Sequence, residues 1–336
     1  MSASLGDGVG ATDALLLGGN LQLRLGSYKL PPPTADDAVV RVEWTGVTEG
    51  DLRMLQAAVL DSLPATASGH ELVGIVESCP GGQLSVGTRV VVNSGKAWFG
   101  SPARPAVDDT RARIQRERPI HPRGFARYVI VAVASLMACP STIEPAIAVL
   151  AQPLATVMHA VGRITARPGR ALLLGYGPVG ALAHLEVVRR FPDTVVTVSE
   201  PCIARGCLAE AHGAIRARES LDDERWPLVI DAGGFPGSLT YAISWTAHGG
   251  TVLALAPRPE RDTIVPAELV ERSLTIVGSS GFDEEFSQAL AILHADPDRY
   301  RPLITDAVLL EEAPARLLEF SKVPAAGRIL IRPWRE

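Results

Sequence analysis

Three glycines with a defined spacing, in Gly175-Tyr-Gly-Pro-Val-Gly180, form the most chemically informative stretch of the chain. In a G-x-G-x-x-G pattern the first glycine permits a tight turn, and the second admits a pyrophosphate close to the backbone. The third glycine lets a helix pack closely on a strand. An acid, Glu200, follows twenty residues after Gly180, where a carboxylate accepts hydrogen bonds from an adenosine ribose.

The flanking sequence predicts the elements that must position these residues. Ala171–Leu174 is a short apolar run, typical of a parallel strand buried on both faces. Val179–Arg190 carries apolar residues at helical spacing, so that the N–H groups of a helix N-terminus would face the phosphates. Val195–Val198 predicts a second strand that leads to Glu200. The stretch therefore predicts a dinucleotide site, with a cofactor-free doubly wound sheet as the alternative.

The choice between the two nicotinamide dinucleotides depends on Glu200 and Arg205. A carboxylate repels a 2′-phosphate, so Glu200 favours NAD(H). Arg205 keeps NADP(H) possible, because a nearby arginine can accept that phosphate. The alternative for Arg205 is a surface side chain on the next helix.

Length and composition restrict the class of protein. A chain of 336 residues predicts two domains, and 47% hydrophobic with 21% charged residues is typical of a globular protein. A net charge of −5 argues against a nucleic-acid partner. No basic leader-like segment begins the chain, so we expect a cytoplasmic protein without a membrane partner. The four cysteines show no C-x-x-C spacing, which predicts free thiols.

Short strands punctuated by glycine and proline precede the glycine motif and predict a partly closed β-barrel. These expected strands are Ala38–Trp44, Leu72–Val76, Gly87–Asn93 and Gly124–Ile130. A long segment rich in glycine, proline and arginine, residues 94–122, interrupts them and predicts either a functional lid over the substrate or a disordered loop. It contains Lys96, Trp98, Phe99 and His121. Trp98 and Phe99 would shape an apolar substrate pocket or cover the barrel.

Several motifs together resemble the medium-chain dehydrogenase/reductase superfamily, the zinc alcohol dehydrogenase-like proteins. The resemblance covers most of the chain, and its motifs are Gly69-His-Glu71, Val86-Gly-Thr-Arg-Val-Val91, Gly124-Phe-Ala-Arg-Tyr-Val129, Pro153-Leu-Ala155, Gly175–Gly180, Asp231-Ala-Gly-Gly234, Gly249-Gly-Thr-Val252, Gly278-Ser279 and Gly327-Arg-Ile-Leu-Ile331.

The resemblance implies an α/β protein of two domains. A GroES-like β-barrel domain would span residues 1–150 and be completed by 302–336. A Rossmann domain, a doubly wound parallel sheet, would span 151–301. The active site would lie in the cleft between the domains, and the protein would be a homodimer or homotetramer that acts on a small molecule.

The resemblance also implies roles for individual residues at the cofactor. Glu200 would bind the ribose. The pyrophosphate would contact the motif residues Gly175, Tyr176, Gly177, Pro178, Val179 and Gly180. Ala232 and Gly233 would lie near the adenine, and Leu255 and Ser279 along the nicotinamide.

The chain departs from the zinc-binding members of the superfamily. Those members use a cysteine, then the histidine of Gly-His-Glu, then a cysteine or glutamate. Here the three positions carry Thr48, His70, and either Thr156 or Gln152. Hydroxyl and neutral amide groups are poor zinc ligands, so we expect a branch without zinc. Cysteines for a structural zinc are also missing from residues 93–122.

Without a metal, catalysis requires another acid or base. Gly50 stands where a proton-relay hydroxyl is usual, and Asp51 is retained. His70 is the best candidate, because imidazole titrates near neutral pH, while Thr48 would donate a hydrogen bond to an oxyanion. Alternatively, His70 and Glu71 only pack the barrel against its loop. Gln152 and Thr156 are candidates for substrate contact.

These observations predict a zinc-independent, NAD(H)-dependent oxidoreductase acting on a small organic alcohol, ketone or activated alkene, in specialised metabolism. One alternative is a cyclase, lyase or isomerase on the same fold. Another is a non-catalytic protein with a relict nucleotide site. The complete glycine motif and Glu200 argue against the last of these.

Overall fold

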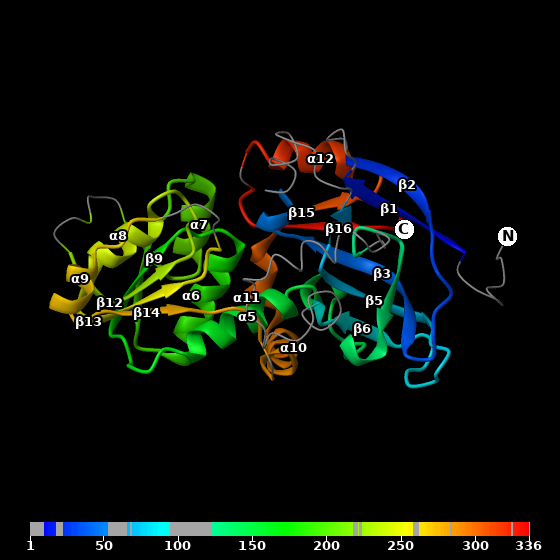
Figure 1. The fold of residues 1–336 in the computed structure, drawn as a ribbon, viewed down its shortest axis with the longest axis horizontal. Coiled ribbons are helices and arrows are strands. Elements are labelled where there is room, and N and C mark those ends of the chain that lie inside the picture. Colours follow the sequence, from blue (N-terminus) through cyan, green and yellow to red (C-terminus); the bar gives the residue numbers. More distant parts are fainter. Residues whose placement is uncertain are drawn as a thin grey trace. The chain divides into compact units, whose positions relative to one another are not determined.

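The fold is known from a computed structural model, which describes residues 10–17, 23–52, 66–67, 69–94, 123–217, 221, 224–257, 262–282, 284–323 and 325–335. The chain divides into two compact units (Figure 1). The first unit comprises Met1–Gln152 together with Leu290–Glu336, and the second comprises Pro153–Ala289.

The second unit contains a six-stranded parallel sheet in the order β11-β10-β9-β12-β13-β14. Its strands are β9 (Arg170–Leu174), β10 (Val195–Ser199), β11 (Ile215–Arg216), β12 (Trp226–Asp231), β13 (Thr246–Ala254) and β14 (Thr275–Gly278). Its helices include α6 (Pro178–Arg190), α7 (Ile203–Ala211), α8 (Ser238–Trp245) and α9 (Pro266–Glu271). The predicted doubly wound parallel sheet is therefore confirmed.

Strand β9 lies in the interior of this sheet, between β10 and β12, and its residues Ala171–Leu174 are buried. Leu172 and Leu174 pack into one apolar cluster with Trp226 and Val229 of β12. In helix α6, every residue from Gly180 to Val187 is buried. The apolar run that predicted a buried strand thus reflects burial on both sides of the sheet.

The first unit is built from short, mostly antiparallel strands. One sheet has the order β15-β16-β3-β5-β6-β8, with β7 also paired to β3, and a second has the order β2-β1-β4. The strands are β1 (Ala11–Leu17), β2 (Leu23–Lys29), β3 (Asp37–Val47), β4 (Thr66–Ala67), β5 (Glu71–Ser78), β6 (Arg89–Val92), β7 (Tyr128–Ala132), β8 (Leu136–Ala138), β15 (Ile304–Leu309) and β16 (Arg328–Arg332). Figure 1 shows red β16 beside blue β3, where Ile329 pairs with Val47.

The C-terminal part of the first unit begins at Leu290, earlier in the chain than the expected boundary at residue 302. Residues 290–301, expected in the Rossmann domain, group with the first unit. His294 Nε2 lies 2.7 Å from Thr142 Oγ1, and Arg301 pairs with Glu144, so side-chain contacts attach this segment there. Residues 151 and 152 also belong to the first unit.

The helices around these boundaries are α4 (Pro145–Ala148), α5 (Ala151–Gly162), α10 (Glu285–Ala295), α11 (Pro297–Tyr300) and α12 (Ala313–Phe320), with 3-10 turns at Val133–Ser135 and Arg301–Leu303. The stretch Pro145–Gly162 is long and apolar enough to cross a bilayer by length and composition. However, 72% of it is buried inside the protein, which is typical of a core helix.

The four cysteines are free, as expected. Cys139 is buried, and this burial raises the pKa of its thiol from 9.0 to about 11. The neutral thiol therefore contributes stability below about pH 9 that is lost as the pH rises towards 11.

We expect Cys139 to resist iodoacetamide at about pH 8, because only about one in a thousand of its thiols is then a thiolate. Exposed Cys207 serves as the control and is expected to be labelled within minutes. Mass spectrometry of the labelled peptides measures both rates. Equal rates in the folded protein would contradict the effect of burial, whereas both cysteines should react alike in denaturing urea.

Candidate functional site

The glycine turn lies where the parallel sheet reverses its winding direction. Strand β9 has β10 on one side and β12 on the other. The Gly175 N–H donates to Ser199 O at 2.9 Å, and the Ala232 N–H donates to Leu174 O at 3.0 Å. Loops from all three strands therefore meet at their carboxyl ends, which is where open α/β sheets bind ligands.

Each glycine of the motif meets a different steric requirement. Gly175 has φ of +84°, a left-handed conformation that favours glycine. A Cβ on Gly180 would lie 2.2 Å from Gly175 O, so only glycine permits this approach of helix and turn. A Cβ on Gly177 would make only a van der Waals contact, 3.5 Å from Arg205 Nη1, so glycine here keeps the backbone uncovered beside that side chain. This arrangement is the one the motif predicts.

Glu200 braces the glycine turn from the end of β10. It is 8% exposed, and its Oε2 accepts the Tyr176 N–H at 2.7 Å. Its Oε1 accepts the Cys202 N–H at 2.8 Å. Each carboxylate oxygen has a second lone pair, so a ribose hydroxyl can still be accepted. The carboxylate therefore holds the turn, a contribution beyond the ribose role expected from its spacing.

The side chain of Tyr176 anchors the same turn in the protein interior. Tyr176 is fully buried, and its hydroxyl lies 2.9 Å from Nδ1 of both His184 and His212. His184 belongs to α6, and His212 follows α7. Two helices and the turn are thereby joined at one phenol oxygen. Sequence spacing gave no signal for this network, because the three side chains meet only after the helices fold onto the sheet.

The loop after β12 is held by Asp231, which is 3% exposed. Its carboxylate accepts the Gly233 N–H at 3.2 Å and the Ser238 hydroxyl at 2.8 Å. Its carbonyl accepts the Leu255 N–H at 2.9 Å. Three of the expected cofactor residues, Ala232, Gly233 and Leu255, thus lie in loops fixed by one aspartate.

Ser279 provides an independent indication of a ligand in the second unit. Its Oγ is buried and has no hydrogen-bond partner among the described residues. A buried polar atom without a partner is costly, and a ligand group can satisfy it. Together with the glycine turn, this residue fits a ligand group bound in the second unit.

In the first unit, two of the expected catalytic residues contact each other. Thr48 follows β3, and Asp51 lies one turn later and is 4% exposed. Asp51 Oδ2 accepts the Thr48 N–H at 2.9 Å and the Thr48 hydroxyl at 2.7 Å. The Thr48 hydroxyl proton is therefore used inside the protein, instead of pointing at an oxyanion as its sequence position had suggested.

A buried ion pair fixes the backbone on either side of these residues. Arg328 in β16 and Glu71 in β5 are 3% and 4% exposed. Arg328 Nη2 lies 3.1 Å from Glu71 Oε2, and Arg328 Nη1 donates to Val47 O at 3.0 Å. Val47 precedes Thr48, and Glu71 follows His70. The single guanidinium therefore sets the positions of both expected catalytic segments.

The expected zinc positions do not supply a donor set for the metal. Thr48 is bonded to Asp51, and Gln152 Oε1 accepts the Ser94 hydroxyl at 2.6 Å. Within the described ranges, no group of three or more His, Cys, Asp or Glu side chains is arranged to hold a metal ion. At these positions half-buried His70 is a strong zinc donor, whereas Thr48 and Gln152 offer only a hydroxyl and a neutral amide.

The remaining expected substrate residues are only partly described. Thr156 lies one turn after Gln152 on α5 and is half-buried. Trp98, together with Lys96, Phe99 and His121, lies outside the described residues. Tyr128 in β7 packs edge-on against Trp334 with ring centroids 5.5 Å apart, which makes it part of the barrel.

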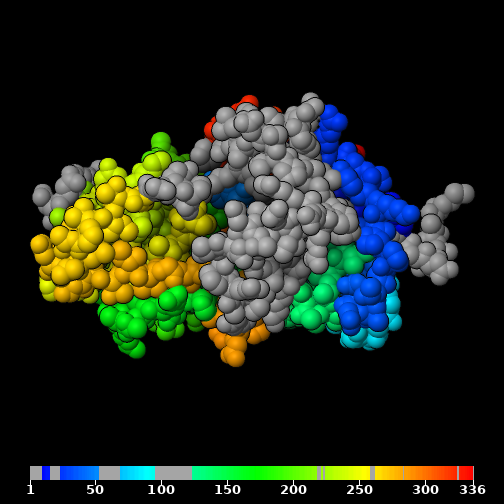
Figure 2. Space-filling view, viewed as in Figure 1, coloured from blue at the N-terminus to red at the C-terminus, as the bar shows by residue number. Residues whose placement is uncertain are grey.

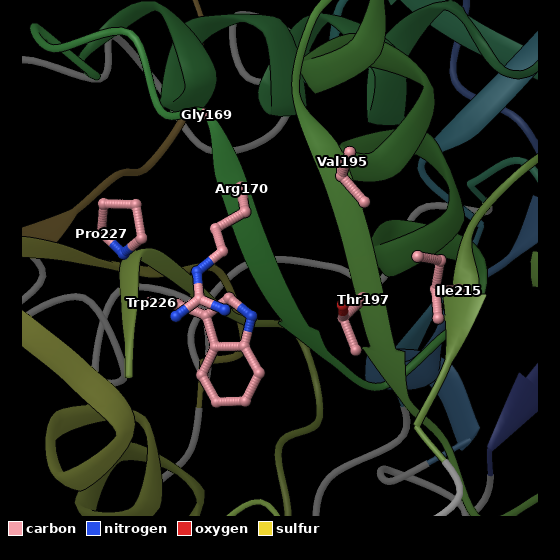
Figure 3. Close-up of a pocket in the computed structure, with 7 residues that line it drawn as sticks. All are labelled: Gly169, Arg170, Val195, Thr197, Ile215, Trp226 and Pro227. Atoms are coloured by element: carbon pink, nitrogen blue, oxygen red, sulfur yellow. The ribbon is translucent and has the colours of Figure 1, made fainter. Parts of the chain in front are cut away.

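A separate hollow of about 580 Å³ lies at the opposite, amino-terminal ends of the parallel strands. Figure 3 shows Arg170 against Trp226 on one side, with Val195, Thr197 and Ile215 on neighbouring strands. Arg170, Val195 and Trp226 are the first residues of β9, β10 and β12. Because the glycine turn follows the carboxyl ends, this hollow is distinct from the dinucleotide site.

A glycine-motif turn at the switch point of a parallel sheet is typical of dinucleotide-binding domains. Residues 34–141 of the first unit match the family model for the alcohol dehydrogenase GroES-like domain. A similar protein is D-altritol 5-dehydrogenase of Agrobacterium fabrum, 29% identical over 311 residues that cover 88% of this chain and 90% of that one.

Solved structures share the fold across both units. One is 2R,3R-butanediol dehydrogenase from Bacillus subtilis, with a TM-score of 0.78 and 20% identity over 96% of this chain and all of that one. Another is a putative zinc-binding dehydrogenase from Sinorhizobium meliloti bound to NADP, with a TM-score of 0.77 and 24% identity over 96% and 99%. These findings support placing the chain in the medium-chain dehydrogenase/reductase superfamily, the zinc-type alcohol dehydrogenase-like proteins.

Proposed function

We propose that the protein is a zinc-independent oxidoreductase that transfers hydride between a nicotinamide dinucleotide and a small organic alcohol, ketone or activated alkene, with a role in specialised metabolism. The observation that carries the proposal is the combination of a complete glycine turn with zinc positions occupied by Thr48 and by either Thr156 or Gln152. The residues expected to bind the cofactor are all present, whereas two of the residues expected to bind the metal are replaced by weaker donors.

The residues that would hold the dinucleotide are the glycine turn, Glu200, and the loops that carry Gly233 and Ser279. Once bound, the nicotinamide ring supplies a hydride donor or acceptor at C4. Glu200 favours NAD(H) through its negative charge, whereas Arg205 beside Gly177 offers a cation to a phosphate. We propose NAD(H) as the preferred cofactor.

We propose that His70 transfers the proton. Alcohol oxidation releases the hydroxyl proton, and a positioned imidazole accepts it as a general base. In the reverse direction the imidazolium returns a proton to the carbonyl oxygen. Arg328 fixes the strand ends beside this residue through Glu71 and Val47, so that the imidazole is presented by a rigid segment.

We expect His70→Ala to lower kcat by on the order of 100-fold or more, because general acid–base catalysis contributes that much. Cofactor affinity should stay within twofold, since His70 and the glycine turn belong to separate units. The pH profile of kcat should also lose one limb. A threefold or smaller change in kcat would instead assign His70 to packing.

Titration with NADH and then NADPH, followed by the fluorescence of the five tryptophans, tests the cofactor assignment. We expect micromolar affinity for NADH and weaker binding of NADPH. Tighter NADPH binding would show that Arg205 dominates Glu200, and binding of neither would favour a relict site. Metal analysis of the same sample should find no stoichiometric zinc, and one zinc per chain would overturn the metal-free mechanism.

The proposal includes a cytoplasmic homodimer or homotetramer. Helix α9, gold in Figure 2, presents a solvent-facing surface on the second unit. Val265 and Val270 are 48% and 78% exposed there, and β14 forms the outer edge of the parallel sheet. Exposed apolar side chains beside a strand edge are typical of a surface that pairs with another chain.

A further inference from the structure

The loop after β14 lies on the side of the parallel sheet towards which the nicotinamide half of a dinucleotide would extend. Glu200, the residue expected to bind the adenosine ribose, directly follows β10. The order of the sheet places β12, β13 and β14 on the other side of β9. A dinucleotide that crosses the carboxyl ends of these strands therefore directs its second half towards β14, which Ser279 directly follows.

The hydroxyl of Ser279 depends on its surroundings for a defined position. Its Oγ is buried and has no hydrogen-bond partner among the described residues. The segment Gly278-Ser-Ser-Gly281 has no apolar side chain that could pack into the protein, and Gly281 has φ of +74°. Contacts at the two ends of the segment must therefore hold the hydroxyl in place.

Two side chains at the end of α5 make these contacts. Arg163 Nη1 donates to Gly278 O at 2.6 Å, directly before Ser279. His159 Nδ1 lies 2.9 Å from Oε1 of Glu285, the first residue of α10. His159 and Arg163 are four residues apart, a spacing that places side chains on the same side of a helix. One end of α5 is thereby joined to the chain both before and after Ser279.

We propose that Arg163 and His159 are positioning residues for the nicotinamide half of the dinucleotide, and that they hold the loop so that Ser279 Oγ hydrogen-bonds to a polar group of that half. This inference rests on the proposed oxidoreductase function. The nicotinamide half offers a carboxamide and two ribose hydroxyls, and a serine hydroxyl can both donate and accept. Arg163 and His159 act through Gly278 and Glu285, with which they are engaged, without touching the cofactor.

Isothermal titration calorimetry of the full-length protein with NADH and with ADP tests this proposal, because ADP contains the adenosine and pyrophosphate but none of the nicotinamide half. We expect Ser279→Ala to weaken NADH binding about three- to tenfold, the contribution of one hydrogen bond. Arg163→Met and His159→Leu should each weaken it about tenfold, because the loop that carries the hydroxyl is displaced. All three variants should change ADP binding less than about twofold.

Two further measurements refine the assignment. Arg163→Lys keeps a donor for Gly278 O and should recover most of the NADH affinity that Arg163→Met loses. Titration of Ser279→Ala with ADP-ribose identifies the contacted group, since this ligand keeps the second ribose but lacks the carboxamide. A loss of ADP-ribose affinity assigns the ribose hydroxyls, and an unchanged affinity assigns the carboxamide. If the wild type binds only NADPH, the 2′-phosphorylated form of each ligand replaces it.

Arg170→Met is the matched control, because Arg170 belongs to the same unit and also donates to a backbone carbonyl, Arg225 O. It lies at the opposite, amino-terminal end of β9, so the variant should leave the affinities for NADH and ADP unchanged. Thermal unfolding verifies that each variant is folded, and Ser279→Ala alone decides the question if Arg163→Met does not fold.

The outcomes separate this proposal from the proposed function. An unchanged NADH affinity in Ser279→Ala would overturn the contact with the nicotinamide half. Equal losses of NADH and ADP affinity in Arg163→Met and His159→Leu would overturn the positioning role, because a general disturbance of the unit weakens both ligands. A wild-type protein that binds neither NADH nor ADP would instead overturn the dinucleotide site itself.

Discussion

Replacing Gly177 with valine is expected to abolish binding of NADH and NADPH while the protein remains folded. A Cβ on Gly177 would lie 3.5 Å from Arg205 Nη1, a van der Waals contact with the end of a flexible side chain, so the fold can accommodate a valine there. The same side chain would occupy the space that a pyrophosphate needs next to the backbone. Tryptophan fluorescence titration should show at least a 100-fold loss of affinity, which corresponds to about 2.7 kcal/mol of binding free energy.

Gly162→Val provides the matched control for that experiment. Gly162 ends α5, and a Cβ there would meet nothing within 4 Å. Its substitution should leave nucleotide affinity unchanged and stability nearly so. Wild-type affinity of the Gly177→Val protein would show that the glycine turn does not hold the dinucleotide.

Replacing Arg328 with methionine is expected to lower the free energy of unfolding by about 3–5 kcal/mol, because it leaves the Glu71 carboxylate buried without its cation. The two side chains are 3% and 4% exposed, and the guanidinium also bonds Val47 O. Urea unfolding followed by circular dichroism measures the loss. Activity should fall as well, since Val47 and Glu71 flank Thr48 and His70.

Two variants control the interpretation of that result. Arg316→Met removes an arginine that is 41% exposed in its pairs with Asp306 and Glu319, so it should cost less than about 1 kcal/mol. The double variant Glu71→Leu with Arg328→Met removes both charges and should recover most of the lost stability. A loss below about 1 kcal/mol for Arg328→Met alone would show that the ion pair does not hold the barrel together.

The sequence by itself determined the parallel sheet and the glycine turn, since both are encoded locally. A buried strand, a G-x-G-x-x-G turn and the first turn of a helix are set by consecutive residues between Ala171 and Arg190. Steric limits at Gly175 and Gly180 act within a few residues. Patterns of this kind are visible in one dimension because the physical constraint is itself short in range.

Only the tertiary structure decided which charges meet. Arg328 and Glu71 are 257 residues apart, and each alone is an ordinary charged residue in a strand pattern. The same is true of Arg123 near Asp51, and of the segment 290–301 that joins the first unit through His294. Desolvation makes the pairing of Arg328 with Glu71 energetically decisive, and their burial depends on how distant strands pack. The fold and cofactor turn were therefore predictable, whereas the arrangement of charges around His70 was not.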